Sequence, residues 1–186
     1  PDCDYLSLHL AFYLASWGMY RGSSFLLQKD YKVLSPVVEE VLKPEYDCLF
    51  GVACVDLREL EVQARLTNVY DYIADYFHPI REEVAGREVT TPVSPVLITK
   101  ILMGTLGCVP AYDRFFQDGV ATYKVTTQEY STNSVLKLVD FYEEHNDRLE
   151  EARRGMQCED LTYPQMKLLD MGLWQVGFER DAGDAK

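Results

Sequence analysis

Basic side chains are scarce in this sequence relative to acidic ones. The chain of 186 residues carries 18 Lys and Arg against 30 Asp and Glu, a formal net charge of −12. Proteins that bind nucleic acid use Lys and Arg to displace phosphate counterions, and anionic membrane surfaces attract the same side chains. We therefore expect this chain to bind neither duplex DNA over a large footprint nor a membrane surface. The partner that its charge favours is a basic protein.

Metal ligands are also few and scattered. The three histidines are His9, His78 and His145, and only His78 has a carboxylate, Asp75, at the spacing that places two ligands on one helical face. A di-iron helical bundle needs Glu-x-x-His pairs on facing helices, and the sequence contains none. We expect no metal site and no cofactor.

The motifs of nucleophilic and phosphate-transferring enzymes are missing. The sequence has no G-x-S-x-G, no P-loop and no dinucleotide-binding glycine motif. Its five cysteines form no C-x-x-C pair, and most have apolar neighbours. We expect most of them to be buried, reduced thiols, which is typical of a cytoplasmic protein.

What the sequence does have is a long apolar stretch at residues 5–27, in which Arg21 is the only full charge. Its length is that of a membrane span, but Arg21, His9 and two glycines favour a buried helix in a water-soluble bundle. We predict that this helix lies at the centre of the fold. It runs to about residue 28 or bends at Gly18 or Gly22.

Small residues form a stripe on this predicted helix. Ala11, Ala15, Gly18 and Gly22 recur at steps of four, three and four residues. Such a stripe lets another backbone or a flat ligand approach closely. Arg21, beside it, needs either an internal carboxylate or a bound anion, and both interpretations stay open. Arg21, Gly18 and Gly22 are therefore candidate ligand-binding residues.

Helix signals recur along the rest of the chain. Ser35-Pro36 and Ser94-Pro95 each pair a capping serine with a first-turn proline, and Asp56 and Glu59 form a capping box before a long amphipathic pattern. Pro79 is expected to kink or end that long helix. The predicted helices cover about 37–43, 45–50, 56–79, 96–103, 111–117, 131–155 and 162–176. Residues 86–95 are predicted to form a loop, and residues 120–125 are the one segment with the composition of a strand. We expect a single all-α domain at 1–178, a bundle of about seven or eight helices around the buried N-terminal helix, with a loose polar tail at 179–186.

Residues 97–116, LITKILMGTLGCVPAYDRFF, carry the most specific chemical signal. Lys100 lies near a helix start, and Asp113 heads the next predicted helix after Val109-Pro110-Ala111-Tyr112. This segment resembles the core of helix-hairpin-helix DNA glycosylases. The resemblance implies that Lys100 is a nucleophile and Asp113 an essential carboxylate. From the residues alone, Lys100 can equally be a surface lysine and Asp113 a first-turn acid stabilised by the helix dipole.

A second resemblance spans the whole chain. Three strings, LHLAFYLASWGMYRGSSFLL, TKILMGTLGCVPAYDRFF and YPQMKLLDMGLWQVGF, together resemble an uncharacterised family of bacterial proteins. This resemblance implies a bacterial cytoplasmic protein and assigns no catalytic residue.

Two functions from different classes follow. The first is a non-enzymatic interaction or regulatory module whose acidic surface recruits a basic protein. The alternative is an enzyme that acts on a nucleotide or nucleic acid and whose pocket combines Arg21, Lys100, Tyr112, Asp113 and Arg114. Exposed aromatic side chains favour the first, and one concave pocket holding Arg21, Lys100 and Asp113 favours the second. The oligomeric state stays open.

Overall fold

The computed structural model describes residues 2–184, and across this range the regular secondary structure is helical, apart from one isolated bridge between Cys158 and Leu161. The α-helices are α1 (Cys3–Ser16), α2 (Ser35–Val41), α3 (Leu60–Ala85), α4 (Pro95–Thr105), α5 (Arg114–Tyr123), α6 (Thr132–Glu144), α7 (Asn146–Gly155) and α8 (Gln165–Asp184). Four 3-10 helices join them: η1 (Phe25–Gln28), η2 (Tyr31–Leu34), η3 (Pro44–Leu49) and η4 (Cys54–Arg58). The all-α class is confirmed.

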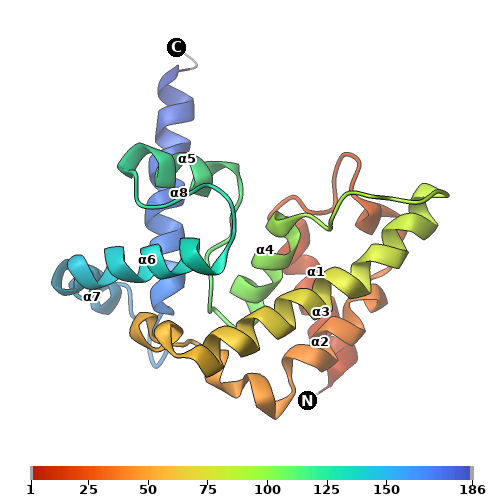
Figure 1. The fold of residues 1–186 in the computed structure, drawn as a ribbon, viewed down its shortest axis with the longest axis horizontal. Coiled ribbons are helices and arrows are strands. Elements are labelled where there is room, and N and C mark those ends of the chain that lie inside the picture. Colours follow the sequence, from red (N-terminus) through yellow and green to blue (C-terminus); the bar gives the residue numbers. More distant parts are fainter. Residues whose placement is uncertain (1, 185–186) are drawn as a thin grey trace.

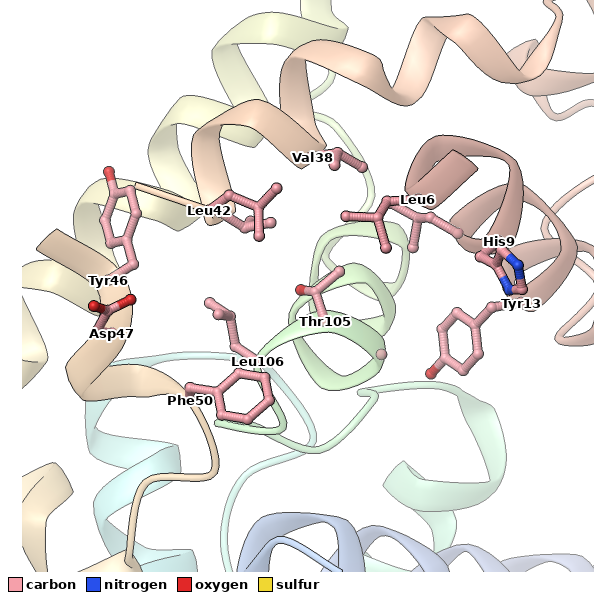
Figure 2. A pocket seen from close by; sticks show the side chains of 13 residues that line it. Leu6, His9, Tyr13, Val38, Leu42, Tyr46, Asp47, Phe50, Thr105 and Leu106 are labelled. Atoms are coloured by element: carbon pink, nitrogen blue, oxygen red, sulfur yellow. The ribbon is translucent and has the colours of Figure 1, made fainter. Parts of the chain in front are cut away.

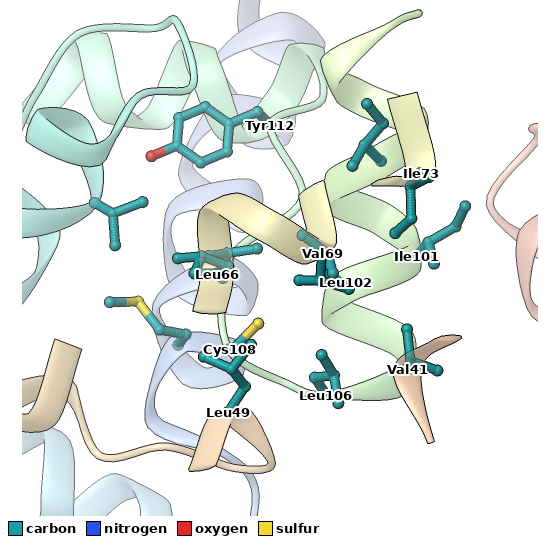
Figure 3. Close-up of a cluster of buried hydrophobic side chains, with 14 of the residues drawn as sticks. Val41, Leu49, Leu66, Val69, Ile73, Ile101, Leu102, Leu106, Cys108 and Tyr112 are labelled. Atoms are coloured by element: carbon teal, nitrogen blue, oxygen red, sulfur yellow. The ribbon is translucent and has the colours of Figure 1, made fainter. Parts of the chain in front are cut away.

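The helices form two groups that share one core. Figure 1 shows α1 to α4 gathered on one side of the molecule and α5 to α8 on the other, with the long α3 running along the first group. Side chains from both groups belong to a single buried apolar cluster. Figure 3 shows part of it, where Leu66, Val69 and Ile73 of α3 pack near Ile101 and Leu102 of α4.

The amphipathic pattern of α3 is confirmed, but the helix begins later than the capping box places its start. Its predicted apolar face is buried at Val62, Leu66, Val69, Ile73 and Phe77. The Asp56 side chain does not cap α3. Asp56 lies within η4, Glu59 follows that helix directly, and α3 begins only at Leu60. The helix also continues past Pro79 and ends at Gly86, whose φ of 63° takes the chain out of the helix.

The prediction of a central N-terminal helix is wrong. The helix α1 ends at Ser16, because Gly18 and Gly22 adopt positive φ angles of 72° and 61° that a right-handed helix cannot contain. The small-residue stripe therefore does not exist as a helical face. Only Ser7, Leu10 and Leu14 of α1 are buried, and Phe12 is 69% exposed.

The central helix is α4 instead. Every residue from Leu97 to Met103 is buried, including Thr99 and Lys100. A helix that is buried on all faces can be apolar on all faces, and this is what distinguishes α4 from a surface helix. The candidate residue Lys100 consequently lies in the interior of the protein.

Close backbone packing does occur in this fold, but between α5 and α8. A Cβ atom at Gly177 of α8 would lie 2.8 Å from the carbonyl carbon of Phe115, and one at Gly119 of α5 would lie 2.7 Å from that of Leu173. These two glycines let the helices approach more closely than any side chain would allow. The pair α5 and α8 forms the most extensive helix contact of those described, and Figure 1 shows the two helices crossing.

Three further predictions differ from the structure. The strand-like segment 120–125 largely belongs to α5, which begins at Arg114 and runs to Tyr123. The predicted helix at 131–155 is broken at His145 into α6 and α7. The predicted loose tail is helical as far as Asp184, and residues 185 and 186 lie outside the described range.

Candidate functional site

An apolar groove opens on the surface of the first helix group. It lies between α1, α2, η3 and the end of α4, and it has a volume of about 500 Å³. Figure 2 shows its side chains converging from these four elements. The apolar lining consists of Leu6, Leu10, Val38, Val41, Leu42, Tyr46, Phe50 and Leu106, and the polar lining of His9, Tyr13, Asp47 and Thr105. This size and composition are typical of binding sites in proteins.

The rim of the apolar groove exposes two large apolar side chains. Phe50 is 73% exposed and Leu42 is 42% exposed. The local backbone holds Phe50 in place, since the next residue, Gly51, has a φ of 60° and donates its N–H to the carbonyl of Leu106 at 2.7 Å. This bond ties the end of η3 to the end of α4, so the rim is anchored to the buried helix.

The two acidic groups beside the groove, Glu40 and Asp47, differ in whether they are free to pair with a bound group. Glu40 is buried and accepts hydrogen bonds from the Tyr46 hydroxyl at 2.9 Å and from Lys43 Nζ at 2.6 Å. Burial, followed by this bond to Glu40, raises the pKa of Tyr46 above its ordinary value. Asp47 is exposed, and its carboxylate has no hydrogen bond or ion pair with any described residue. Asp47 is therefore the acid that can pair with a bound cation.

Tyr13 lies where the apolar groove meets the protein interior. Its ring packs over Gly104, where a Cβ atom would lie 2.7 Å from Tyr13 Cζ. Its hydroxyl is buried and makes no hydrogen bond with the described residues. Burial first, and the nearby carboxylates of Asp170 and Asp113 next, raise the pKa of this hydroxyl. It therefore stays protonated.

Behind Tyr13 lies an ionic cluster made of Lys100, Asp113, Lys167 and Asp170. Lys100 Nζ lies 3.2 Å from Asp113 Oδ2, and Lys167 Nζ lies 3.2 Å from Asp170 Oδ2. Both ammonium groups also face the ring of Trp17, at 5.5 Å and 5.2 Å from its centroid. The cluster thus gathers charges from α4, the start of α5 and α8 around one aromatic ring.

Three members of the ionic cluster, Lys100, Asp113 and Asp170, also form hydrogen bonds with the backbone. Lys100 Nζ donates to the carbonyl of Trp17 at 3.2 Å, and Asp170 accepts the N–H of Ala111 at 2.9 Å. Asp113 accepts the N–H of Phe116 at 3.2 Å and so caps α5. Burial raises the pKa of Asp170, and Lys167 opposes this shift. These bonds join the loop after α1, the α4–α5 loop and α8.

The structure therefore brings Lys100 and Asp113 together, as the pocket hypothesis requires. The interpretation of Lys100 as a surface lysine is wrong, because only 6% of its side chain is exposed. The interpretation of Asp113 as an acid at the start of a helix agrees with its capping bond. Neither residue lines the apolar groove.

The other candidate residues lie in different environments. Tyr112 is buried, and its hydroxyl is 2.8 Å from Ser134 Oγ. Arg114 is exposed and pairs with Asp181 of α8. Arg21 lines a separate groove that does not include Lys100 or Asp113, so the predicted single pocket is not formed there.

Arg21 itself does not match the prediction of an internal ion pair. Among residues 2–184 it forms no salt bridge, and its guanidinium folds over Gly18, where a Cβ atom would lie 2.8 Å from Arg21 Nε. Gly22, with a φ of 61°, does not line the groove beside Arg21. Gly18 thus supports Arg21, and Gly22 only turns the chain.

The expectation that most cysteines are buried is also wrong. Cys54 and Cys108 are buried, whereas Cys48 and Cys158 are exposed and Cys3 is intermediate. Burial raises the pKa of the Cys54 and Cys108 thiols to about 12, so both are held as unreactive thiols. Across the described range no group of three or more His, Cys, Asp and Glu side chains is arranged to hold a metal ion.

Several of these residues were not identified from the sequence. Lys167 and Asp170 have the i, i+3 spacing of a helical pair, and that spacing within the predicted last helix was a usable signal. Nothing in the sequence marked Tyr13 or Asp47, because the groove forms only when four distant elements meet. Phe50, an apolar residue directly before a turn glycine, gave a weak signal.

Comparison with known proteins adds no assignment. The chain matches no protein-family model, no curated protein and no solved structure. Between residues 2 and 184, none of the helices combines the length and the apolar character needed to cross a bilayer.

Proposed function

We propose that this chain is a non-enzymatic interaction module whose apolar groove binds a basic, amphipathic segment of a partner protein. The observation that supports it is the open groove of about 500 Å³ with exposed Phe50 and Leu42 on its rim and the unpaired carboxylate of Asp47 beside them. Recognition of this kind places the apolar face of a helix in the groove and its charges on the rim.

The apolar contribution is large enough to matter. Fully burying a Phe or Leu side chain is worth about 1.5–3 kcal/mol, and both rim residues start out exposed. Because Phe50 is 73% and Leu42 42% exposed, closing a partner over both supplies roughly 2–3 kcal/mol, about a third of the ~8 kcal/mol of a micromolar complex. No rearrangement of the core is needed, since the groove is already open.

The charge of the chain selects the partner. The net charge of −12 attracts a basic segment and repels an acidic one. Asp47 provides a specific ion-pair site on the rim, beside the apolar lining of the groove. A segment with Leu-type residues on one face and Lys or Arg on the other satisfies both conditions.

We also propose that the chain is a bacterial cytoplasmic protein. The resemblance of three long segments to a bacterial family supports a bacterial protein. The buried thiols of Cys54 and Cys108 suit a reducing cytoplasm.

The test uses a synthetic helical peptide of about 16 residues with Leu on one face and Lys on the other. Its affinity is measured by fluorescence anisotropy for the full chain and for two variants. Phe50→Ser should weaken binding by about tenfold or more, because it removes a rim contact. Phe12→Ser is the matched control, since Phe12 is 69% exposed but lies outside the groove, and it should change the affinity by less than about twofold.

Charge reversal completes this test. Asp47→Lys should weaken the Lys-bearing peptide and strengthen a peptide of the same pattern with Glu in place of Lys. Absence of saturable binding, or an equal loss in the Phe12 and Phe50 variants, would contradict the proposal.

A second candidate function is the glycosylase-like enzyme, and one observation favours it. Lys100 Nζ and Asp113 Oδ2 lie 3.2 Å apart although they come from different elements, as the resemblance implies. A lysine nucleophile must be neutral and must reach its substrate, however, and Lys100 is buried, paired and bonded to the carbonyl of Trp17. This geometry supports the interaction module better.

The enzyme candidate has its own direct test. A lysine nucleophile forms a Schiff base with an abasic site in single-stranded DNA, and borohydride reduction traps it as a covalent complex. The assay compares the wild-type chain with Lys100→Met and with Lys167→Met as the matched control from the same cluster. Trapping that is lost only in Lys100→Met would establish Lys100 as the nucleophile, and absence of trapping would exclude that role.

A further inference from the structure

A second groove lies beside Arg21, and its lining is basic in an otherwise acidic protein. It has a volume of about 720 Å³ and is formed by the loop after α1, the end of α3 and the loop before α4. Two arginines, Arg21 and Arg81, line it, and none of its lining residues is Asp or Glu. The chain as a whole carries 30 acidic and only 18 basic residues, so this groove differs in charge from the average surface of the protein.

The arginines of this groove have unused hydrogen-bond donors. Arg21 has no hydrogen bond or ion pair with the described residues, so all five guanidinium N–H groups are available. Arg81 donates to the carbonyl and to the hydroxyl of Thr91, at 2.9 Å and 3.1 Å, and keeps its other donors. The bonds to Thr91 fix the Arg81 fork against the loop.

Short polar side chains complete the ring of donors. Ser23, Ser24 and Ser94 line the groove, and none of their hydroxyls is hydrogen-bonded within the described part of the chain. Gly18, at a φ of 72°, has no side chain, and this allows the Arg21 guanidinium to lie over the backbone. The donors therefore line a space in which no carboxylate of the protein competes for them.

We infer that this groove binds the phosphoryl group of a small phosphorylated molecule. Arginine guanidinium groups and hydroxyls are the side chains that bind phosphate oxygens most often and most strongly. Apart from Gln28, the remaining lining is apolar and includes Met19, Phe25, Val84, Val89, Pro92 and Leu97, which suits an uncharged body such as a nucleoside. This site is separate from the apolar groove, with which it shares no lining residue.

The test is calorimetric titration at low ionic strength with AMP, inorganic phosphate and adenosine. AMP should bind saturably, inorganic phosphate should bind more weakly, and adenosine should show no measurable binding. Arg21→Ala should weaken AMP binding by about tenfold or more, because it removes charge-assisted hydrogen bonds. Its exposed position predicts an unchanged unfolding temperature.

Arg87→Ala is the matched control. Arg87 is exposed in the α3–α4 loop and does not line the groove. Its removal changes the net charge by the same amount as the removal of Arg21. It should change AMP affinity by less than about twofold. The inference is overturned if neither AMP nor phosphate binds, if adenosine binds as tightly as AMP, or if Arg21→Ala weakens binding no more than Arg87→Ala does.

Discussion

The packing of α5 against α8 gives the sharpest prediction about stability. Replacing Gly177 by Ala places a methyl group within 2.8 Å of the carbonyl carbon of Phe115 and within 3.0 Å of the amide nitrogen of Gly119. Ordinary carbon contacts are about 3.5–4.0 Å, so the two backbones must separate by close to 1 Å. Backbone atoms cannot rotate aside as a flexible side chain can.

The cost can be estimated from two opposing effects. Separating the two helices by 0.5–1 Å loses roughly a quarter to a half of the dispersion energy between their contacting atoms. Overpacking of this kind typically costs about 1–3 kcal/mol or more. Ala is favoured over Gly inside a helix by about 1 kcal/mol. Because α5 and α8 share such an extensive contact, we expect a net loss of about 2 kcal/mol.

Gly172→Ala provides the matched control in the same helix. A Cβ atom at Gly172 meets nothing within 4 Å, so only the helix propensity remains, and this variant should gain up to about 1 kcal/mol. Urea unfolding and thermal unfolding, both followed by circular dichroism, measure the two variants, and their melting temperatures should differ by roughly 6–12 °C. If Gly177→Ala is as stable as Gly172→Ala, the close backbone contact is not present.

Three further predictions concern other parts of the chain. Although burial opposes it, hydrogen bonds from Arg153, Gln165 and Tyr142 lower the pKa of Glu150 from 4.5 to about 2. The stability that this carboxylate contributes is therefore present above pH 4.5 and is lost as the pH falls toward 2. In acid titrations, the difference in free energy of unfolding between the wild type and Glu150→Gln should fall by up to roughly 3 kcal/mol. Lys100→Ala leaves Asp113 without its cation, and urea unfolding should show a loss of about 3 kcal/mol. Gly104→Ala displaces the Tyr13 ring, so anisotropy should show about threefold or greater weakening of the basic peptide, with a stability change below about 1 kcal/mol.

The sequence predicted the helical class and the face of α3, because both depend on local periodicity. Buried Val69, Ile73 and Phe77 follow directly from the spacing of apolar residues. It misplaced the central helix for the same reason. An apolar run indicates burial, but a glycine that takes a positive φ ends a helix regardless of composition, and Gly18 does so here.

Sites depend on contacts between distant segments, so the sequence predicted them only in part. The proximity of Lys100 and Asp113 was expected only from the resemblance to helix-hairpin-helix glycosylases, and the residues alone left Lys100 as a possible surface lysine. The groove containing Phe50 and Asp47 was not, since its walls are brought together by tertiary packing alone. Arg21 was marked by its isolation as a charge, and the structure adds the second arginine that makes it a candidate site.

The central claim is that the apolar groove is a docking site for a basic amphipathic segment. Methyl-detected NMR of the full chain, titrated with the Leu and Lys peptide, tests it most directly. The account predicts saturable shifts of the methyl groups of Leu6, Val38 and Leu42, with Leu60 and Leu161, which are exposed elsewhere, unchanged. Shifts that are absent from the groove, or spread evenly over all exposed methyl groups, would contradict it.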